Sequence, residues 1–126
     1  MKRILLIEDD AGIREGIGDL LTLEGYRVDR AANGEEGLAL LRRPDRPALV
    51  IVDLVMPVMN GMQFLERFHQ DPRLAGIPAV LMTAAMPPAA ALPKASDYLS
   101  KPFDVGELLR LVERYCGPPG VAAPVA

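Results

Sequence analysis

The sequence lacks several features that would each point to a particular class of protein. Its 126 residues include a single cysteine, Cys116, which excludes an internal disulfide and favours a reducing compartment, the cytoplasm. There is no basic run and the formal net charge is −3, so we expect no direct binding to nucleic acid. No hydrophobic run approaches the length of a membrane span, and we therefore expect no membrane association.

The length fits one domain, which can bury about two-thirds of its unfolded surface without help from a disulfide or a metal. Residues 117–126 contain three prolines, two glycines and no charge. This composition is typical of a tail or linker. We therefore expect a folded domain over residues 1–116 and a tail or linker over residues 117–126.

Five short segments predict strands. The run Leu49–Val52 is apolar without alternation, as in strands of a parallel sheet that are buried on both faces, and it ends on Asp53. A second run, Ile4–Ile7, ends on acidic residues in the same way. Further strands are expected over residues 26–31 at a sheet edge, over residues 78–83, and over residues 97–100.

Amphipathic segments follow these strands and begin at residues suited to cap a helix. The expected caps are Asp10, Asn33 and Asp104, whereas Asn60-Gly61 is expected to form a turn before the third helix. Alternation of strand and helix predicts an α/β fold, a three-layer αβα sandwich around a five-stranded parallel sheet in the order 2-1-3-4-5. Between residues 83 and 97 the fourth helix is expected to be short or irregular, because three prolines interrupt it: Pro87, Pro88 and Pro93.

Polar and charged side chains stand at the ends of four of these strands, and therefore at one edge of the sheet. They are Glu8, Asp9, Asp53, Thr83 and Lys101. Three adjacent carboxylates repel one another, and Lys101 offsets only one of their charges. Mg²⁺, a hard cation that prefers oxygen ligands, would offset the other two. Such a neutral pocket can admit a phosphoryl group, with Asp53 as a carboxylate nucleophile and the Thr83 hydroxyl and Lys101 ammonium meeting the phosphoryl oxygens.

Together these motifs resemble the receiver domain of response regulators in two-component signalling. The similar segments extend over about residues 3–116 and are Leu6–Asp10, Asp53–Pro57 with Asn60-Gly61, Thr83-Ala84, and Tyr98–Phe103. The resemblance implies that Asp53 is the phosphoacceptor and that Lys101 binds the phosphate. It also implies Mg²⁺ bound by Glu8, Asp9, Asp53 and the backbone carbonyl of Val55, a switch formed by Thr83 and Tyr98, and a cis bond between Lys101 and Pro102.

The resemblance further implies that a histidine kinase or a histidine phosphotransfer protein supplies the phosphoryl group, and it allows a phosphorylation-dependent homodimer. The downstream effector is not readable from the sequence. Thr83 and Lys101 are 18 positions apart, a shorter spacing than is usual in the family, which puts the usual output surface in doubt. Val55 and Ala85 are apolar and cannot orient a hydrolytic water, so we expect slow loss of phosphate and no turnover of an external substrate.

Three alternatives remain open at this point. The chain could be a receiver-like interaction module that works without phosphorylation, as its altered fourth helix suggests. It could be a Mg²⁺-dependent phosphohydrolase with Asp53 as nucleophile, although Val55 stands where a second carboxylate would be needed. It could also be a flavin-binding electron carrier, although the loop after the first strand is acidic rather than rich in hydroxyls.

Overall fold

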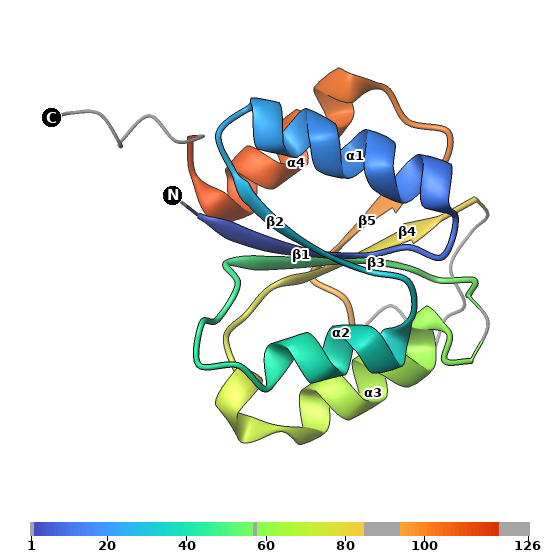
Figure 1. Cartoon of the computed structure of the whole chain (residues 1–126), viewed down its shortest axis with the longest axis vertical. Helices are drawn as coiled ribbons and strands as arrows, with labels where there is room; N and C mark the ends of the chain where they lie inside the picture. The colour runs from blue at the N-terminus through green and yellow to red at the C-terminus, as the bar shows by residue number, and fades with distance from the viewer. Residues whose placement is uncertain (1, 57, 85–93, 119–126) are drawn as a thin grey trace, which may run out of the picture.

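A computed structural model describes residues 2–56, 58–84 and 94–118. Figure 1 shows a central sheet with helices on both faces. The strands are β1 (Arg3–Ile7), β2 (Arg27–Ala31), β3 (Leu49–Asp53), β4 (Ala79–Thr83) and β5 (Asp97–Ser100). The helices are α1 (Ala11–Leu23), α2 (Gly34–Leu41), α3 (Gly61–Gln70) and α4 (Val105–Cys116), with a short 3-10 turn, η1 (Pro72–Leu74).

The sheet has the predicted order, β2-β1-β3-β4-β5, and every neighbouring pair is parallel. Its central strand, β3, is buried along its whole length. In register, Val52 of β3 lies opposite Ile7 of β1 and Leu81 of β4. The carboxyl ends of these strands therefore meet at one edge, as the sequence predicted.

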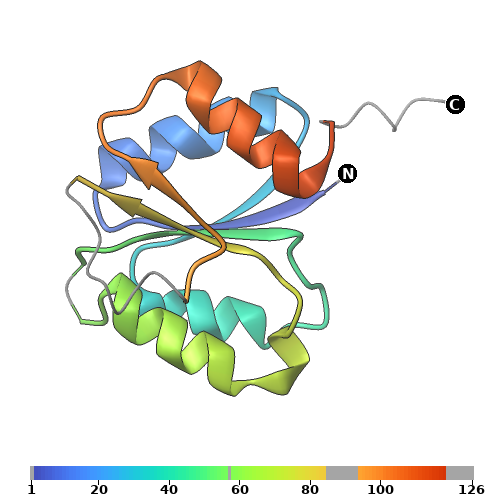
Figure 2. The ribbon, with the colours of Figure 1, turned by 180° about the vertical axis from the view of Figure 1, so that it is seen from behind.

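Two hydrophobic cores lie on opposite faces of the sheet. Helices α2 and α3 cover one face and helices α1 and α4 cover the other, as the two opposite views show (Figures 1 and 2). Because side chains alternate along a strand, Leu5 and Ile7 belong to the first core, whereas Ile4 and Leu6 belong to the second. This division explains why the buried strands read as continuous apolar runs.

The predicted helix caps are confirmed. The Asp10 side chain accepts a hydrogen bond from the backbone N–H of Ile13 at 3.0 Å, and Asn33 caps α2 in the same way. A full capping box, in which the side chains of the cap and of the third helical residue each bond the other's backbone, begins α4 at Asp104. A second capping box begins α3 at Asn60, which the sequence assigned only to a turn.

The segment expected to form a short or irregular helix, residues 86–93, lies outside the described residues, so that expectation stays a prediction. The helix labelled α4 is the later one that follows β5, and it has 12 residues. Residues 119–126 of the expected tail also lie outside the described part. Among the residues that the structure describes, no helix is long and apolar enough to cross a membrane.

Gly61 allows α3 to start directly against the end of β3. A Cβ atom at this position would lie 2.6 Å from the carbonyl oxygen of Asp53 and 2.8 Å from the Cα of Leu54. Backbone atoms cannot swing away as a flexible side chain can. The Gly61 N–H instead donates to the carbonyl of Leu54 at 2.9 Å and ties the helix to the loop that follows Asp53.

The substitution Gly61→Ala should lower the free energy of unfolding by about 1–3 kcal/mol, because the added methyl overpacks against backbone. The matched control is Gly16→Ala, since a Cβ on Gly16 of α1 meets nothing within 4 Å. That variant should gain about 0.5–1 kcal/mol from helix propensity. Urea unfolding followed by circular dichroism measures both. Equal stability of the two variants would contradict the close approach at Gly61.

Candidate functional site

Buried polar side chains gather at one edge of the sheet. Among the described residues, the buried polar or charged side chains are Glu8, Asp53 and Thr83, with exposed fractions of 1%, 6% and 3%. Glu8 directly follows β1, Asp53 ends β3 and Thr83 ends β4. Burying such groups is costly unless they are paired, so their meeting at one place calls for a partner of opposite charge.

Lys101 is that partner. Its Nζ lies 3.1 Å from Oε1 of Glu8 and 3.2 Å from Oδ2 of Asp53, so one ammonium bridges acids from two neighbouring strands. The backbone N–H of Lys101 donates to the carbonyl of Thr83 at 2.8 Å, which fixes the residue beside the end of β4. The predicted cis bond between Lys101 and Pro102 is confirmed.

The charges in this site are only partly balanced. The pKa of the Glu8 carboxyl is raised to about 6. Burial is the largest cause and the negative charge of Asp53 adds to it, whereas the Asp10 backbone N–H and Lys101 act in the opposite direction. Burial alone would lower the pKa of Lys101, but its hydrogen bonds to Glu8 and Asp53 outweigh burial and raise that pKa. Lys101 is therefore firmly cationic, whereas Glu8 keeps a proton more readily than an ordinary glutamate.

Three carboxylates form a cluster that fits a hard divalent cation. Glu8, Asp9 and Asp53 each offer one oxygen, and these oxygens lie within 4.8 Å of one another. Ligand oxygens on an octahedral Mg²⁺ are roughly 3–4 Å apart, so a small closure of the cluster would bring them to that spacing. Asp9 is exposed and can approach a cation from the solvent side. The carbonyl of Val55 as a further ligand stays a prediction.

Thr83 and Tyr98, the residues expected to form a switch, lie on adjacent strands. Thr83 ends β4 opposite Ser100, and Tyr98 lies opposite Leu81 of the same strand. Tyr98 is half-buried and packs against the core on the α2 and α3 face. The structure thus places Tyr98 on β5, which Lys101 directly follows, and Thr83 on the neighbouring strand β4, while their switching role stays a prediction.

Comparison with known proteins identifies the family. The family model described as the response regulator receiver domain matches residues 4–113. The chain belongs to this family. Receiver domains are phosphoacceptor modules of two-component signalling rather than enzymes that act on external substrates, so the phosphohydrolase and flavin alternatives are not retained.

Individual relatives agree with this assignment. An uncharacterized 14.6 kDa protein of Leptolyngbya boryana is 38% identical over 90% of this chain and 88% of its own length. The regulator RpaA of Synechocystis, a longer DNA-binding protein, is 37% identical over 89% of this chain but only 48% of its own length. Response regulator TrrA of Thermotoga maritima, solved in complex with Mg²⁺-BeF, has a TM-score of 0.81 at 32% identity, covering 91% of this chain and 99% of TrrA.

One residue of the receiver's acidic edge was not predicted from the sequence. The guanidinium of Arg14, on the first turn of α1, donates to the backbone carbonyl of Glu8 at 2.9 Å and to that of Asp9 at 3.4 Å. The available signal was an arginine shortly after the acidic loop. Spacing alone does not say that its side chain turns back toward that loop.

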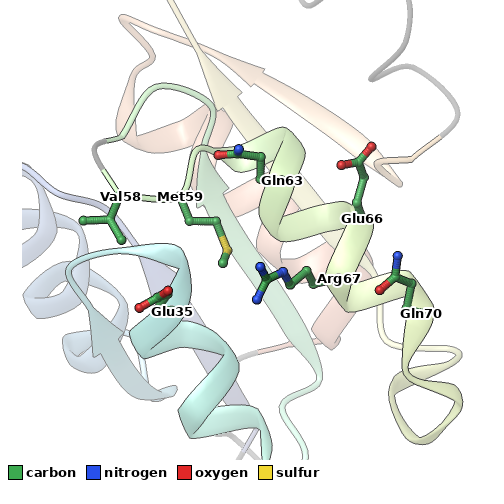
Figure 3. A pocket seen from close by; sticks show the side chains of 7 residues that line it. All are labelled: Glu35, Val58, Met59, Gln63, Glu66, Arg67 and Gln70. Carbon is green, nitrogen blue, oxygen red and sulfur yellow. The ribbon is translucent and has the colours of Figure 1, made fainter.

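Two hollows of the receiver differ in place and character. An apolar hollow of about 370 Å³ lies beside the acidic site and is lined by Ile13, Ala84, Lys101, Pro102 and Phe103. A polar pocket of about 270 Å³ lies elsewhere, between α2 and α3, where Arg67 extends toward α2 (Figure 3). The second pocket contains none of the acidic site residues, so the chemistry of the site belongs to the edge that carries Lys101.

A divalent cation at the carboxylate cluster must compete with the proton on Glu8. We expect the apparent affinity for Mg²⁺ to be constant above about pH 7 and to fall below pH 6, approaching tenfold per pH unit for one displaced proton. The direction follows from the raised pKa of Glu8, because the protonated carboxyl is a poor ligand. Calorimetric titration from pH 5 to 7.5 measures this.

The control for this titration is Glu8→Gln, which keeps the size of the side chain but cannot titrate. It should bind Mg²⁺ more weakly at pH 7.5 and lose the fall in affinity near pH 6. A wild-type affinity that stays flat between pH 7 and pH 5 would contradict the assignment of this pKa to a metal-binding carboxyl.

Proposed function

We propose that this receiver is a phosphorylation-dependent signalling switch in which Asp53 accepts a phosphoryl group from a histidine kinase or a histidine phosphotransfer protein. The observation that carries the proposal is the Lys101 ammonium held 3.2 Å from the Asp53 carboxylate and 3.1 Å from Glu8. A cation beside a buried carboxylate at the open edge of a sheet suits a group that must receive a highly charged ligand.

In the transfer, a carboxylate oxygen of Asp53 attacks phosphorus and the bond between phosphorus and the donor's imidazole nitrogen breaks. The leaving nitrogen takes up a proton from water, and the products are an aspartyl phosphate and a free imidazole. Lys101 meets a phosphoryl oxygen and offsets part of the added charge, because its Nζ already lies beside Asp53. The Thr83 hydroxyl, at the end of the neighbouring strand, donates to a second phosphoryl oxygen.

We propose Mg²⁺ as the cofactor, held by Glu8, Asp9, Asp53 and the carbonyl of Val55. When bound, the cation supplies positive charge to the transferring phosphoryl group. Support comes from the spacing of the three carboxylates and from the TrrA structure, whose complex contains Mg²⁺-BeF. Glu8 and Asp9 follow β1, and the acceptor Asp53 ends β3. Their carboxylates can share one cation because β1 and β3 are neighbours in the sheet.

The proposed output is a conformational change of Thr83 and Tyr98. Thr83 moves toward the phosphoryl group, and Tyr98 turns further into the space beside it, so that phosphorylation shifts an existing equilibrium between two states. The half-buried position of Tyr98 supports this, because the ring has room to become either more exposed or more buried.

The remaining assignments are also proposals. Residues 1–116 form the receiver domain and residues 117–126 a tail or linker. A cytoplasmic location is supported by the buried free thiol of Cys116. We propose no direct contact with nucleic acid or membrane, and a phosphorylation-dependent homodimer as one form of output. The chain spans about half of the length of RpaA.

Treatment with acetyl phosphate and Mg²⁺ tests the proposal. Intact-mass spectrometry should show a gain of one phosphoryl group in the wild type and none in Asp53→Asn, which removes the nucleophile but keeps the shape. Lys101→Met should take up phosphate far more slowly, since the carboxylates lose their cation. Equal labelling of wild type and Asp53→Asn would refute the assignment of the acceptor.

The same sample gives the lifetime of the phosphoryl group once acetyl phosphate is removed. We expect slow loss, because Val55 has an apolar side chain that cannot position water; Ala85, the other residue behind this expectation, lies outside the described residues. A half-life that lengthens strongly on replacing Mg²⁺ with a chelator is compatible with this, whereas rapid loss in the presence of Mg²⁺ contradicts it.

The substitution Thr83→Ala tests the switch. We expect phosphorylation of Asp53 to persist but the phosphorylation-dependent shifts of backbone NMR signals in β4 and β5 to be largely lost, because no hydroxyl remains to follow the phosphoryl group. The control is Thr22→Ala, whose hydroxyl donates to Gly18 within α1. Shifts of wild-type size in Thr83→Ala would show that the coupling does not pass through this residue.

A further inference from the structure

We propose that Arg14 is a positioning residue that holds the acidic loop between β1 and α1 in the geometry needed for Mg²⁺. The inference rests on the proposed function, since it concerns the same site. The loop has three residues, Glu8, Asp9 and Asp10, and it carries two of the three carboxylates of the cluster. Whatever fixes this loop therefore fixes most of the ligand set.

Both the backbone and the side chain of Arg14 donate hydrogen bonds to the loop. Its backbone N–H donates to the carbonyl of Asp10 at 2.9 Å in the first turn of α1. Its guanidinium then turns back and donates through Nη1 to the carbonyl of Glu8 at 2.9 Å, with a longer contact of 3.4 Å to the carbonyl of Asp9. The planar guanidinium suits this task because several N–H donors point in fixed directions.

The other hydrogen bonds of the loop hold its two ends but not its middle residue, Asp9. The Glu8 N–H donates to Ala31 on β2 at 3.0 Å, and the Asp10 N–H donates to Oε2 of Glu8 at 3.1 Å. These contacts hold the first and last residues of the loop. Asp9 stands between them with an exposed side chain, and the guanidinium of Arg14 reaches its carbonyl.

Arg14 acts on backbone carbonyls rather than on the carboxylates. Among the described residues, no ion pair joins Arg14 to Glu8, Asp9 or Asp53, whereas Arg30 on the same side of the domain pairs with Glu15 and Asp19. The guanidinium of Arg14 therefore does not directly pair with the carboxylates of the cluster. The cluster keeps its negative charge for a divalent cation while its backbone is fixed.

The experiment compares Arg14→Met, which removes every donor, with Arg14→Lys, which keeps a cationic donor. The control is Arg110→Met, because Arg110 is exposed on α4. Two readouts are used: the dissociation constant for Mg²⁺ by calorimetry, and amide hydrogen exchange of residues 8–10 in the metal-free protein. Loss of groups that orient metal ligands typically lowers metal affinity by about 10–100-fold.

We expect Arg14→Met to bind Mg²⁺ about tenfold more weakly or worse and to exchange the loop amides faster, and Arg14→Lys to restore part of both. Arg110→Met should match the wild type. Unchanged affinity in Arg14→Met, or weaker binding with unchanged exchange, would overturn the inference. Should Arg14→Met fail to fold, Arg14→Gln is measured in its place against the same outcomes.

The design separates this inference from the proposed function. A wild type that binds no Mg²⁺ and takes up no phosphate from acetyl phosphate refutes the proposed function, whatever Arg14 does to the loop amides. A wild type that does both, together with Arg14→Met that equals it in affinity and exchange, refutes only the role of Arg14.

Discussion

The ammonium of Lys101 between two buried carboxylates is the interaction on which the rest of the structure depends. Taking a lone carboxylate out of water costs several kcal/mol, and two of them at one edge would also repel each other. Lys101 directly follows β5, so its charge reaches Glu8 and Asp53 only because β1, β3, β4 and β5 end together at one edge of the sheet. The arrangement of the strands therefore also determines how the charges of the site are paired.

The negative charge of the site is only partly neutralised, and this favours the proposed function. One ammonium offsets one of three negative charges, and burial, together with the nearby charge of Asp53, raises the pKa of Glu8 to about 6. A fully neutralised cluster would have less electrostatic repulsion in the metal-free protein but would attract a second cation only weakly. The hollow next to Lys101 has the opposite character, because the other residues that line it are apolar.

Much of this arrangement could be predicted from the sequence because it depends on local pattern. Unbroken apolar runs indicated strands covered on both faces, alternation with helices predicted a parallel sheet, and short polar residues marked several helix starts. The strand order was the one usual for such a sheet in a domain of this size. The same logic placed Glu8, Asp53 and Lys101 at one edge, since parallel strands end together. What could not be predicted depends on distances between atoms: the oxygens that Lys101 contacts, the backbone carbonyls that Arg14 reaches, and the close packing that leaves no room for a Cβ at Gly61.

The two cations of the site divide the work between charge and shape. Lys101 binds carboxylate oxygens and so sets how much negative charge the pocket holds, whereas Arg14 binds carbonyl oxygens and so sets where that charge lies. Exchanging these roles would be unfavourable: an arginine at the carboxylates would occupy both oxygens of an acid that a metal or phosphoryl group needs, and a lysine at the carbonyls would fix the loop less firmly. On the proposed function, the compact ammonium of Lys101 suits a position beside the nucleophile because it leaves lone pairs of the carboxylate oxygens open. The planar guanidinium of Arg14 suits a position beside the backbone because its N–H donors point in fixed directions and so fix the orientation of the carbonyls.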